Sequence, residues 1–209
     1  MKMYSVVDLV NMALRQIKVR EIISLDDETV EAKSAKQMLK LSLGDLLNRA
    51  DWRFAKVKRV LPKLDIESID AAYATEKIMS SNVYLYPEDV VRIREVSSGR
   101  CRGAAEYELL SVKLKSRDSF VSVLVSRLPH IELTYTRYCA EVNLWPSTFQ
   151  RAFVHYFAYN MAMYSAMGDA QATQLQLYNM AVKEAMASNT NEDKHRMRID
   201  PDILKARDW

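Results

Sequence analysis

The hydrophobic period of this chain changes twice, and this change constrains the fold more than any other feature. Near both ends, large apolar residues recur every three or four positions, the spacing of one face of an α-helix. Between about residues 53 and 140 they recur every second position, the spacing of one face of a β-strand. The pattern predicts helices at each end of the chain and a β segment between them.

Two helices are expected before residue 52. The first covers residues 5–18, where Ser5 and Asp8 have the spacing of a capping box. The second covers residues 28–48, and we take Asp26 and Asp27 as its N-caps. Gly44 lies inside this second helix, where glycine costs about 1 kcal/mol relative to alanine. We interpret it as a point of close contact with a neighbouring helix.

The middle of the chain is predicted to form an antiparallel sheet. Its clearest strand alternates Ile131, Leu133 and Tyr135 with polar residues. Strands that follow one another without intervening helices favour antiparallel pairing. Residues 65–82 are compatible with a short helix or a loop. The expected strands are 54–61, 90–96, 107–114, 120–126 and 131–136.

Helical spacing returns at Pro146, which suits the first turn of a helix. Gly168 is expected to end that helix, and a second one is expected over about residues 170–188. Residues 190–209 are polar and irregular, and Pro201 prevents a continuous helix there. The first of these helices has a buried stripe of Phe149, Phe153, Phe157, Met161 and Tyr164.

We therefore predict an α+β fold in which the N- and C-terminal helix pairs form an up-and-down four-helix bundle with one antiparallel β insertion. An extended C-terminal tail follows the bundle. The predicted parts are residues 1–52 for the first helix pair, 53–140 for the β insertion, 141–189 for the second pair and 190–209 for the tail.

The composition argues against several classes of chemistry. The chain has four glycines, and none forms the Gly-rich turn that a phosphate cradle needs. None of its three histidines has a ligand-type partner at metal-site spacing, and we expect His155 to be a hydrogen-bonded structural residue. No nucleophile motif occurs. We predict that the protein is not an enzyme and has neither a cofactor nor a metal site.

Charge, cysteine content and hydropathy describe an ordinary globular protein. The net charge of +3 gives no whole-chain argument for binding nucleic acid. Cys101 and Cys139 are expected to be free thiols. No apolar run reaches the roughly 20 residues that a membrane span needs, and the N-terminus lacks the apolar region of a secretory signal.

The C-terminal segment combines basic and large apolar residues. A disordered tail would contain fewer large apolar residues. We interpret the segment as one that orders on a partner, with its terminal aromatic residue as an anchor. The alternative is a tail that folds back on its own chain. The residues concerned are Lys194, His195, Arg196, Arg198, Ile199, Ile203, Leu204 and Trp209.

Four stretches of the chain resemble the head-to-tail adaptor family of short-tailed bacteriophages, known as tail tubular protein A or gatekeeper. Residues 5–19 and 24–54 resemble the family's first helix, acidic loop and long second helix. YLYPEDVVRIREV resembles its Tyr-x-Leu-Pro-x-Asp motif, although Tyr86 replaces the usual leucine before Pro87. Residues 144–189 resemble the closing helical pair, and ILKARDW resembles the short C-terminal signature.

The resemblance implies a structural virion protein in the phage neck, assembled in the host cytoplasm. Such a protein forms a homododecameric ring between the portal and the tail nozzle or tail tube, with fibres as possible further partners. The genome passes through the ring without specific binding. The resemblance also implies that the C-terminal segment contacts the portal through Arg196, Arg198, Ile199, Ile203, Leu204 and Trp209.

Two other functions remain open from the residues. A helix-turn-helix DNA-binding regulator would use the N-terminal helices, although the connection between them is longer than the usual turn. An enzyme would require an unrecognised carboxylate site. A tail-completion protein of a longer-tailed virus would have the same sequence features as the adaptor.

Overall fold

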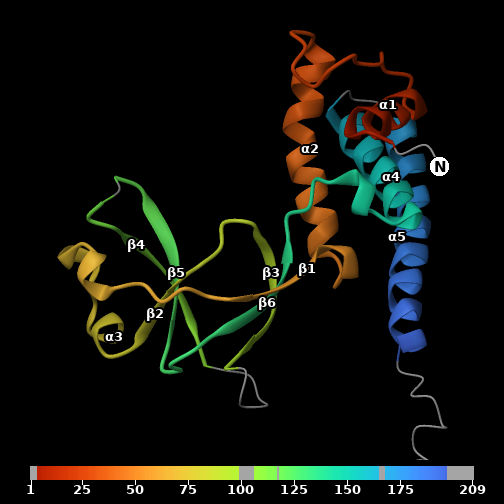
Figure 1. Cartoon of the computed structure of the whole chain (residues 1–209). Coiled ribbons are helices and arrows are strands. Elements are labelled where there is room, and N and C mark those ends of the chain that lie inside the picture. The colour runs from red at the N-terminus through yellow and green to blue at the C-terminus, as the bar shows by residue number, and fades with distance from the viewer. Residues whose placement is uncertain (1–3, 99–105, 117, 165–167, 197–209) are drawn as a thin grey trace, which may run out of the picture. The chain divides into compact units, whose positions relative to one another are not determined.

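A computed structural model describes residues 4–98, 106–116, 118–164 and 168–196 of the chain. The chain is α+β and divides into two compact units (Figure 1). The helical unit comprises residues 1–54 and 139–209, and the β unit comprises residues 55–138. The predicted β insertion, 53–140, differs from the β unit by two residues at each end.

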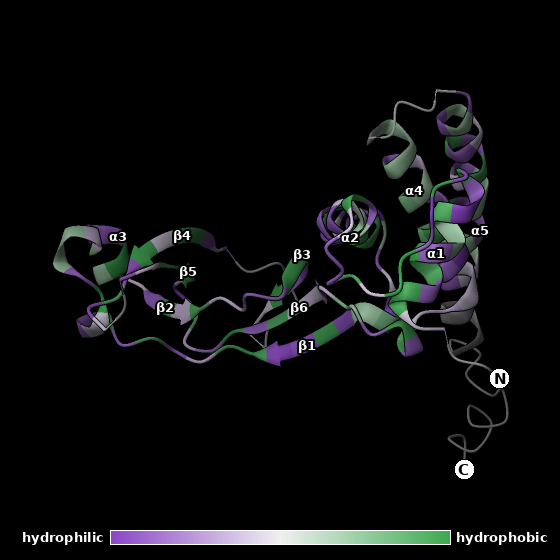
Figure 2. Cartoon of the chain, turned by 90° about the horizontal axis from the view of Figure 1, so that it is seen from above, coloured by the Kyte–Doolittle hydropathy of each residue, from purple (hydrophilic) through white to green (hydrophobic). Residues whose placement is uncertain are grey.

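The helical unit is built around one central helix, α4. The helices α1, α2 and α5 each pack against α4 (Figures 1 and 2). Short 3-10 turns, η1 (Arg53–Ala55) and η4 (Val142–Leu144), lie near the ends of the β unit. The helices are α1 (Val6–Gln16), α2 (Val30–Asn48), α4 (Ser147–Tyr164) and α5 (Gly168–Arg196).

The central position of α4 follows from its sequence. Its phenylalanines lie on one side, but other apolar side chains cover the remaining sides, and a helix that is apolar all round belongs in an interior. Three helices can then surround it, each burying a single face. The buried residues of α4 are Phe149, Ala152, Phe153, Val154, Phe157, Ala158, Met161 and Ala162.

An aromatic cluster joins the start of α4 to the end of α2. Trp52 is 1% exposed, and its ring meets the Phe149 ring edge-on with centroids 4.9 Å apart. Its Nε1 donates a hydrogen bond to the Leu46 carbonyl oxygen at 2.8 Å. Trp145 contacts Phe149 and Phe153 in the same way, and its Nε1 donates to the Cys139 carbonyl oxygen at 3.0 Å. Both indole groups are thus buried with their polar atoms paired.

The β unit contains two separate antiparallel sheets of three strands each. The first has the order β1-β6-β3 and the second the order β2-β5-β4. A short helix, α3 (Glu76–Met79), and the 3-10 turns η2 (Ile66–Ser68) and η3 (Ala71–Tyr73) precede β2. The strands are β1 (Lys56–Val60), β2 (Asn82–Leu85), β3 (Val90–Ser97), β4 (Glu108–Lys113), β5 (Phe120–Ser126) and β6 (Glu132–Arg137).

Two apolar cores explain why the strands divide into two sheets. Leu124 and Tyr84 belong to one core with Leu133 and Tyr135 of β6. The neighbouring Val123 and Val125 belong to a second core with Ile69, Ile78, Val83 and Val112. Because successive residues of a strand point to opposite faces, β5 is covered on both sides and lies between the two cores.

The predicted up-and-down four-helix bundle with a single β insertion is therefore wrong. The described residues form five α-helices and two three-stranded sheets instead. A four-helix bundle needs four helices that each present one apolar face to a shared core, whereas α4 is itself the core of the helical unit. In the β unit, the apolar residues on both faces of β5 require two layers rather than one.

Helix ends follow the predicted chemistry in α1 but not in α2. The capping box of α1 is confirmed: Asp8 N donates to Ser5 Oγ at 3.1 Å, and Ser5 N donates to Asp8 Oδ2 at 2.8 Å. The N-cap of α2 is Thr29, whose Oγ1 accepts from Ala32 N at 3.2 Å, so Asp26 and Asp27 are not caps. Asp27 instead accepts backbone hydrogen bonds inside the connecting loop.

The strands expected at 54–61, 90–96, 107–114, 120–126 and 131–136 are confirmed within a few residues. The strand β2 was missed, and the stretch at 65–82, left open between a short helix and a loop, contains the short helix α3. The last helix was placed too short: α5 extends to Arg196, so the irregular tail expected from residue 190 is wrong for 190–196.

Candidate assembly surface

The residues predicted to contact the portal lie at and beyond the end of the described chain. Arg196 is the last residue of α5. Arg198, Ile199, Ile203, Leu204 and Trp209 lie outside the described residues, and their role stays a prediction. The structure thus locates where this segment begins, which is the C-terminal end of α5.

The helix α5 continues beyond the part of it that is packed in the helical unit. Among its side chains described up to residue 191, Ala185 is the last buried one, and Asn189 is the last that hydrogen-bonds to another element. Thr190 and Asn191 are exposed, and the helix ends seven residues after Asn189, about 10 Å further along its axis. Figure 1 shows the end of α5 reaching past the other helices of its unit.

Asn189 connects α5 to the segment that leaves the helical unit. Its Nδ2 donates to the Asp51 carbonyl oxygen at 3.0 Å, and its Oδ1 accepts from Arg53 N at 3.0 Å. A cavity of about 380 Å³ lies beside this contact, lined by Trp52, Phe54, Phe149 and Asn189 among others. The projecting end of α5 is therefore held at its base by paired polar groups.

Large apolar side chains remain exposed on the outward faces of α2 and α5. Leu41 of α2 is 56% exposed, and Met180 of α5 is 70% exposed. Val30 of α2 and Leu177 of α5 are also exposed. Single exposed apolar residues are common, but these lie on two helices that flank the same central helix. They make both faces candidates for contact with another chain.

A groove of about 660 Å³ lies between α1 and α4. Arg15, Arg151 and His155 give it a basic lining, with Met12 and Val154 as apolar neighbours. Its arginines are engaged: Arg15 pairs with Glu21 at 3.2 Å, and Arg151 pairs with Glu184 at 3.0 Å. These pairs are exposed and contribute little stability.

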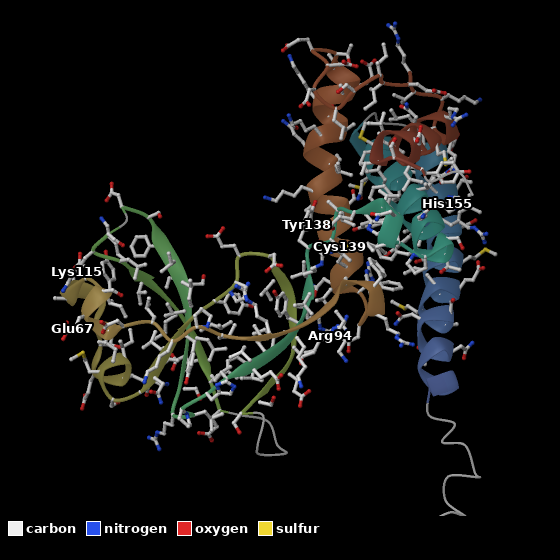
Figure 3. All side chains as sticks on the ribbon, in the orientation of Figure 1. Glu67, Arg94, Lys115, Tyr138, Cys139 and His155 are labelled. Carbon is white, nitrogen blue, oxygen red and sulfur yellow. The ribbon has the colours of Figure 1, made fainter. Side chains whose placement is uncertain are left out.

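His155 is a hydrogen-bonded structural residue, as predicted. Its Nδ1 lies 3.0 Å from Gln174 Oε1, which is buried on α5. Figure 3 shows His155 among the packed helices. Cys139 is buried and forms no disulfide, as expected, whereas Cys101 lies outside the described residues.

A polar cluster in the β unit was missed by the sequence analysis. Tyr135 of β6 donates from its hydroxyl to Asp89 Oδ1 at 3.1 Å. Burial raises the pKa of the Tyr135 hydroxyl and Asp89 raises it further, whereas Arg59 acts in the opposite direction. The Tyr86-Pro87-Glu88-Asp89 sequence was a signal for this cluster, but it was considered only as part of a family resemblance.

This cluster borders a groove of about 590 Å³ in the β unit. Phe120, which is 57% exposed, and Leu85 supply apolar surface, and Arg59, Glu88 and Asp89 supply charge. The arrangement can bind a segment of another chain, but its charges are mixed in sign. It does not by itself select one kind of ligand.

Among the described residues, no group of three or more His, Cys, Asp or Glu side chains is placed to hold a metal ion. Within the same residues, no helix combines the length and apolar character that crossing a membrane requires.

No protein-family model and no curated protein matches the sequence of this chain.

Proposed function

We propose that this chain is a structural subunit of a bacteriophage virion, one copy in a homododecameric head-to-tail adaptor ring. One end of the ring binds the portal, and the other receives the tail nozzle or tail tube, with fibres as possible further partners. The genome leaves through the ring without being bound specifically. The subunit assembles in the host cytoplasm, catalyses no reaction and needs no cofactor.

The observation that carries this proposal is the projecting end of α5. The helix continues seven residues past Asn189, the last of its described side chains that contacts another element, and it leads into the basic and apolar segment 194–209. A short stretch of helix without tertiary packing is only marginally stable in water. A projecting helix that leads into an apolar segment is therefore suited to packing on a partner.

The sequence resemblance supplies the identity of that partner. The segment that α5 presents contains ILKARDW, which resembles the family's C-terminal signature. Resemblance also assigns this segment to the portal. Because ring contacts are repeated around a closed symmetry, modest individual interfaces can give a stable assembly while the free subunit stays monomeric.

The direct test is to mix the purified protein with purified portal and examine the mixture by electron microscopy and sedimentation. We expect the protein alone to be largely monomeric and to form a ring coaxial with the portal on mixing. Absence of portal binding would overturn the proposal. Stable rings of the protein alone at low concentration would overturn the expectation that the ring forms only on the portal.

A truncation locates the contact. Deletion of residues 197–209 removes Arg198, Ile203 and Trp209 but keeps all of α5, including the Asn189 contacts. We expect the far-UV circular dichroism and the unfolding midpoint to stay unchanged and the portal binding to be lost. As a control, deletion of Met1–Met3 at the other end should leave portal binding intact.

The alternative function is that of a helix-turn-helix DNA-binding regulator, which the purified protein tests by its binding to duplex DNA. The connection between α1 and α2 covers residues 17–29, compared with the usual three to four residues of that motif. Duplex binding with a steep dependence on salt would favour the regulator, and an adaptor should bind duplex weakly.

A further inference from the structure

Residues on the outward faces of α2 and α5 can be placed at corresponding levels along the axis of α4. Asp45 of α2 accepts a hydrogen bond from the Tyr156 hydroxyl at 3.0 Å, and the Tyr156 ring lies 4.6 Å from the Tyr178 ring of α5. Asp45 and Tyr178 therefore lie at nearly the same level along α4. Along α4, Tyr156 and then Asn160 contact Asp45 and then Ser42, so α2 runs antiparallel to α4. Arg151 and then His155 contact Glu184 and then Gln174, so α5 also runs antiparallel to α4. Consequently α2 and α5 run in the same direction.

This alignment gives a register for the two outward faces. Counting back from Asp45 and Tyr178, Leu41 lies level with Gln174 and Lys36 lies level with Asp169, since both helices rise about 1.5 Å per residue. On α5 the outward stripe contains Asp169, Thr173, Gln176 and Met180, all exposed. On α2 it contains Gln37, Lys40, Leu41 and Gly44.

The two stripes have complementary charge. Among the described residues, Lys40 of α2 has no hydrogen-bond or ion-pair partner, whereas Lys33 and Lys36 are paired with Glu28 and Asp26. The Asp169 carboxylate of α5 likewise has no partner among the described residues. Lys40 lies four residues beyond Lys36, about one helical turn along α2 from the level of Asp169. A lysine side chain is long enough to span this distance.

Gly44 adds a steric match. A Cβ atom placed on Gly44 would meet nothing within 4 Å, so the close contact expected with a neighbouring helix of the same chain is absent from the described residues. A glycine inside an exposed helix costs stability, and it leaves a shallow gap beside the exposed Leu41. Met180, on the outward face of α5, is long and flexible enough to fill such a gap.

We propose that α2 of one copy packs against α5 of the next, and that this contact closes the ring. The occupant of each face is thus a second copy of this chain, with Leu41 beside Thr173 and the Lys40 side chain reaching about one helical turn along to Asp169. Rotation about a ring axis parallel to the helices keeps every residue at its own height, so faces level within one copy stay level between copies. This inference rests on the proposed ring function.

Cysteine cross-linking tests the register. In a Cys101→Ser background, Leu41→Cys and Thr173→Cys are combined in one chain and treated with a short bis-maleimide on the portal. We expect a ladder of covalent multimers, whereas a mixture of the two single variants should give dimers only. The matched control is Leu41→Cys with Leu175→Cys, because Leu175 is also exposed but lies about 200° round α5 from Thr173.

The outcomes separate this inference from the proposed function. Rings seen on the portal without a ladder from the 41/173 pair, or with an equal ladder from the control pair, overturn the register but leave the adaptor function standing. If no ring forms on the portal, the cross-linking is repeated with the variant protein alone at high concentration. A 41/173 ladder there supports the contact on its own, and monomers alone overturn it.

A charge exchange tests the polar contact. We expect Lys40→Glu and Asp169→Lys each to weaken ring formation about fivefold per contact, the upper range for an exposed ion pair. Combining both changes in one chain should restore assembly, because the pair is re-formed with reversed signs. Failure of the double variant to assemble better than either single variant overturns the pairing, provided that its unfolding midpoint is unchanged.

Discussion

Asn189 holds the backbone of Arg53 through its side chain: its Oδ1 accepts a hydrogen bond from Arg53 N at 3.0 Å. The same amide group donates from Nδ2 to the Asp51 carbonyl oxygen at 3.0 Å. One side chain thus spans the two peptide groups that flank Trp52, at the point where the chain leaves the helical unit. The contact joins residues 136 and 138 positions apart in sequence.

Replacement of this amide should destabilise the helical unit. We expect Asn189→Ala to lower the free energy of unfolding by about 1–3 kcal/mol, because it leaves two backbone groups without a partner. Asn189→Asp keeps an acceptor for Arg53 N but loses the donor to Asp51, so its loss should be smaller. Urea unfolding followed by tryptophan fluorescence measures both. Asn191→Ala, at an exposed position of the same helix, is the control.

Tyr178 carries a buried hydroxyl that should be dispensable for stability. The residue is 2% exposed, and its hydroxyl oxygen has no hydrogen-bond partner among the described residues. We expect Tyr178→Phe to raise the free energy of unfolding by about 1 kcal/mol, because a buried polar group without a partner is removed and the ring is retained. A lower unfolding midpoint in urea would contradict this.

The same residue should influence stability at alkaline pH. Burial raises the pKa of the Tyr178 hydroxyl, and it raises that of Tyr156 together with Asp45. The folded state then holds these protons more tightly than the unfolded state, so stability is fully present below the unfolded pKa of about 10 and is lost as pH rises through the folded pKa. Tyr178→Phe should reduce this loss, measured by urea unfolding between pH 8 and pH 11. Tyr4→Phe, at an exposed position, should not change it.

Gly44 should show opposite effects on folding and on assembly. We expect Gly44→Ala to stabilise the free subunit by about 1 kcal/mol, because alanine is the better helix former and its Cβ meets nothing within 4 Å. On the portal, the added methyl group should weaken ring formation if α2 and α5 of neighbouring copies meet there. Thermal unfolding and sedimentation with portal measure the two effects. Equal assembly by Gly44→Ala and the native protein would count against the contact.

The β unit offers a test of the polar cluster. Tyr135→Phe removes the hydroxyl that donates to Asp89 Oδ1 at 3.1 Å. We expect a loss of about 1–2 kcal/mol in the free energy of unfolding, because a part-buried hydrogen bond to a carboxylate is removed. Tyr107→Phe, at an exposed position of the same unit, is the matched control. No difference between the two variants in urea unfolding would show that the hydrogen bond contributes little.

Local chemistry predicted several features of this protein from sequence. The spacing of apolar residues was sufficient to locate α1, α4 and five of the six strands, because helix and strand periods depend only on neighbouring residues. The capping box at Ser5 and the hydrogen-bonded state of His155 were predicted in the same way. The projecting end of α5 was missed, because the polarity of residues 190–196 was read as irregular structure although polar residues are compatible with an exposed helix.

What the sequence alone determined is which segments are helical or extended and which face of each is apolar. Only the tertiary structure decided how those faces are covered: α4 became the centre of three helices instead of one wall of a four-helix bundle, and the strands divided into two sheets around β5. It also decided that Asn189 meets the backbone beside Trp52 and that α2 and α5 lie at matched heights. The physical reason is that period is a local property, whereas the choice of packing partner depends on contacts between residues far apart in the chain.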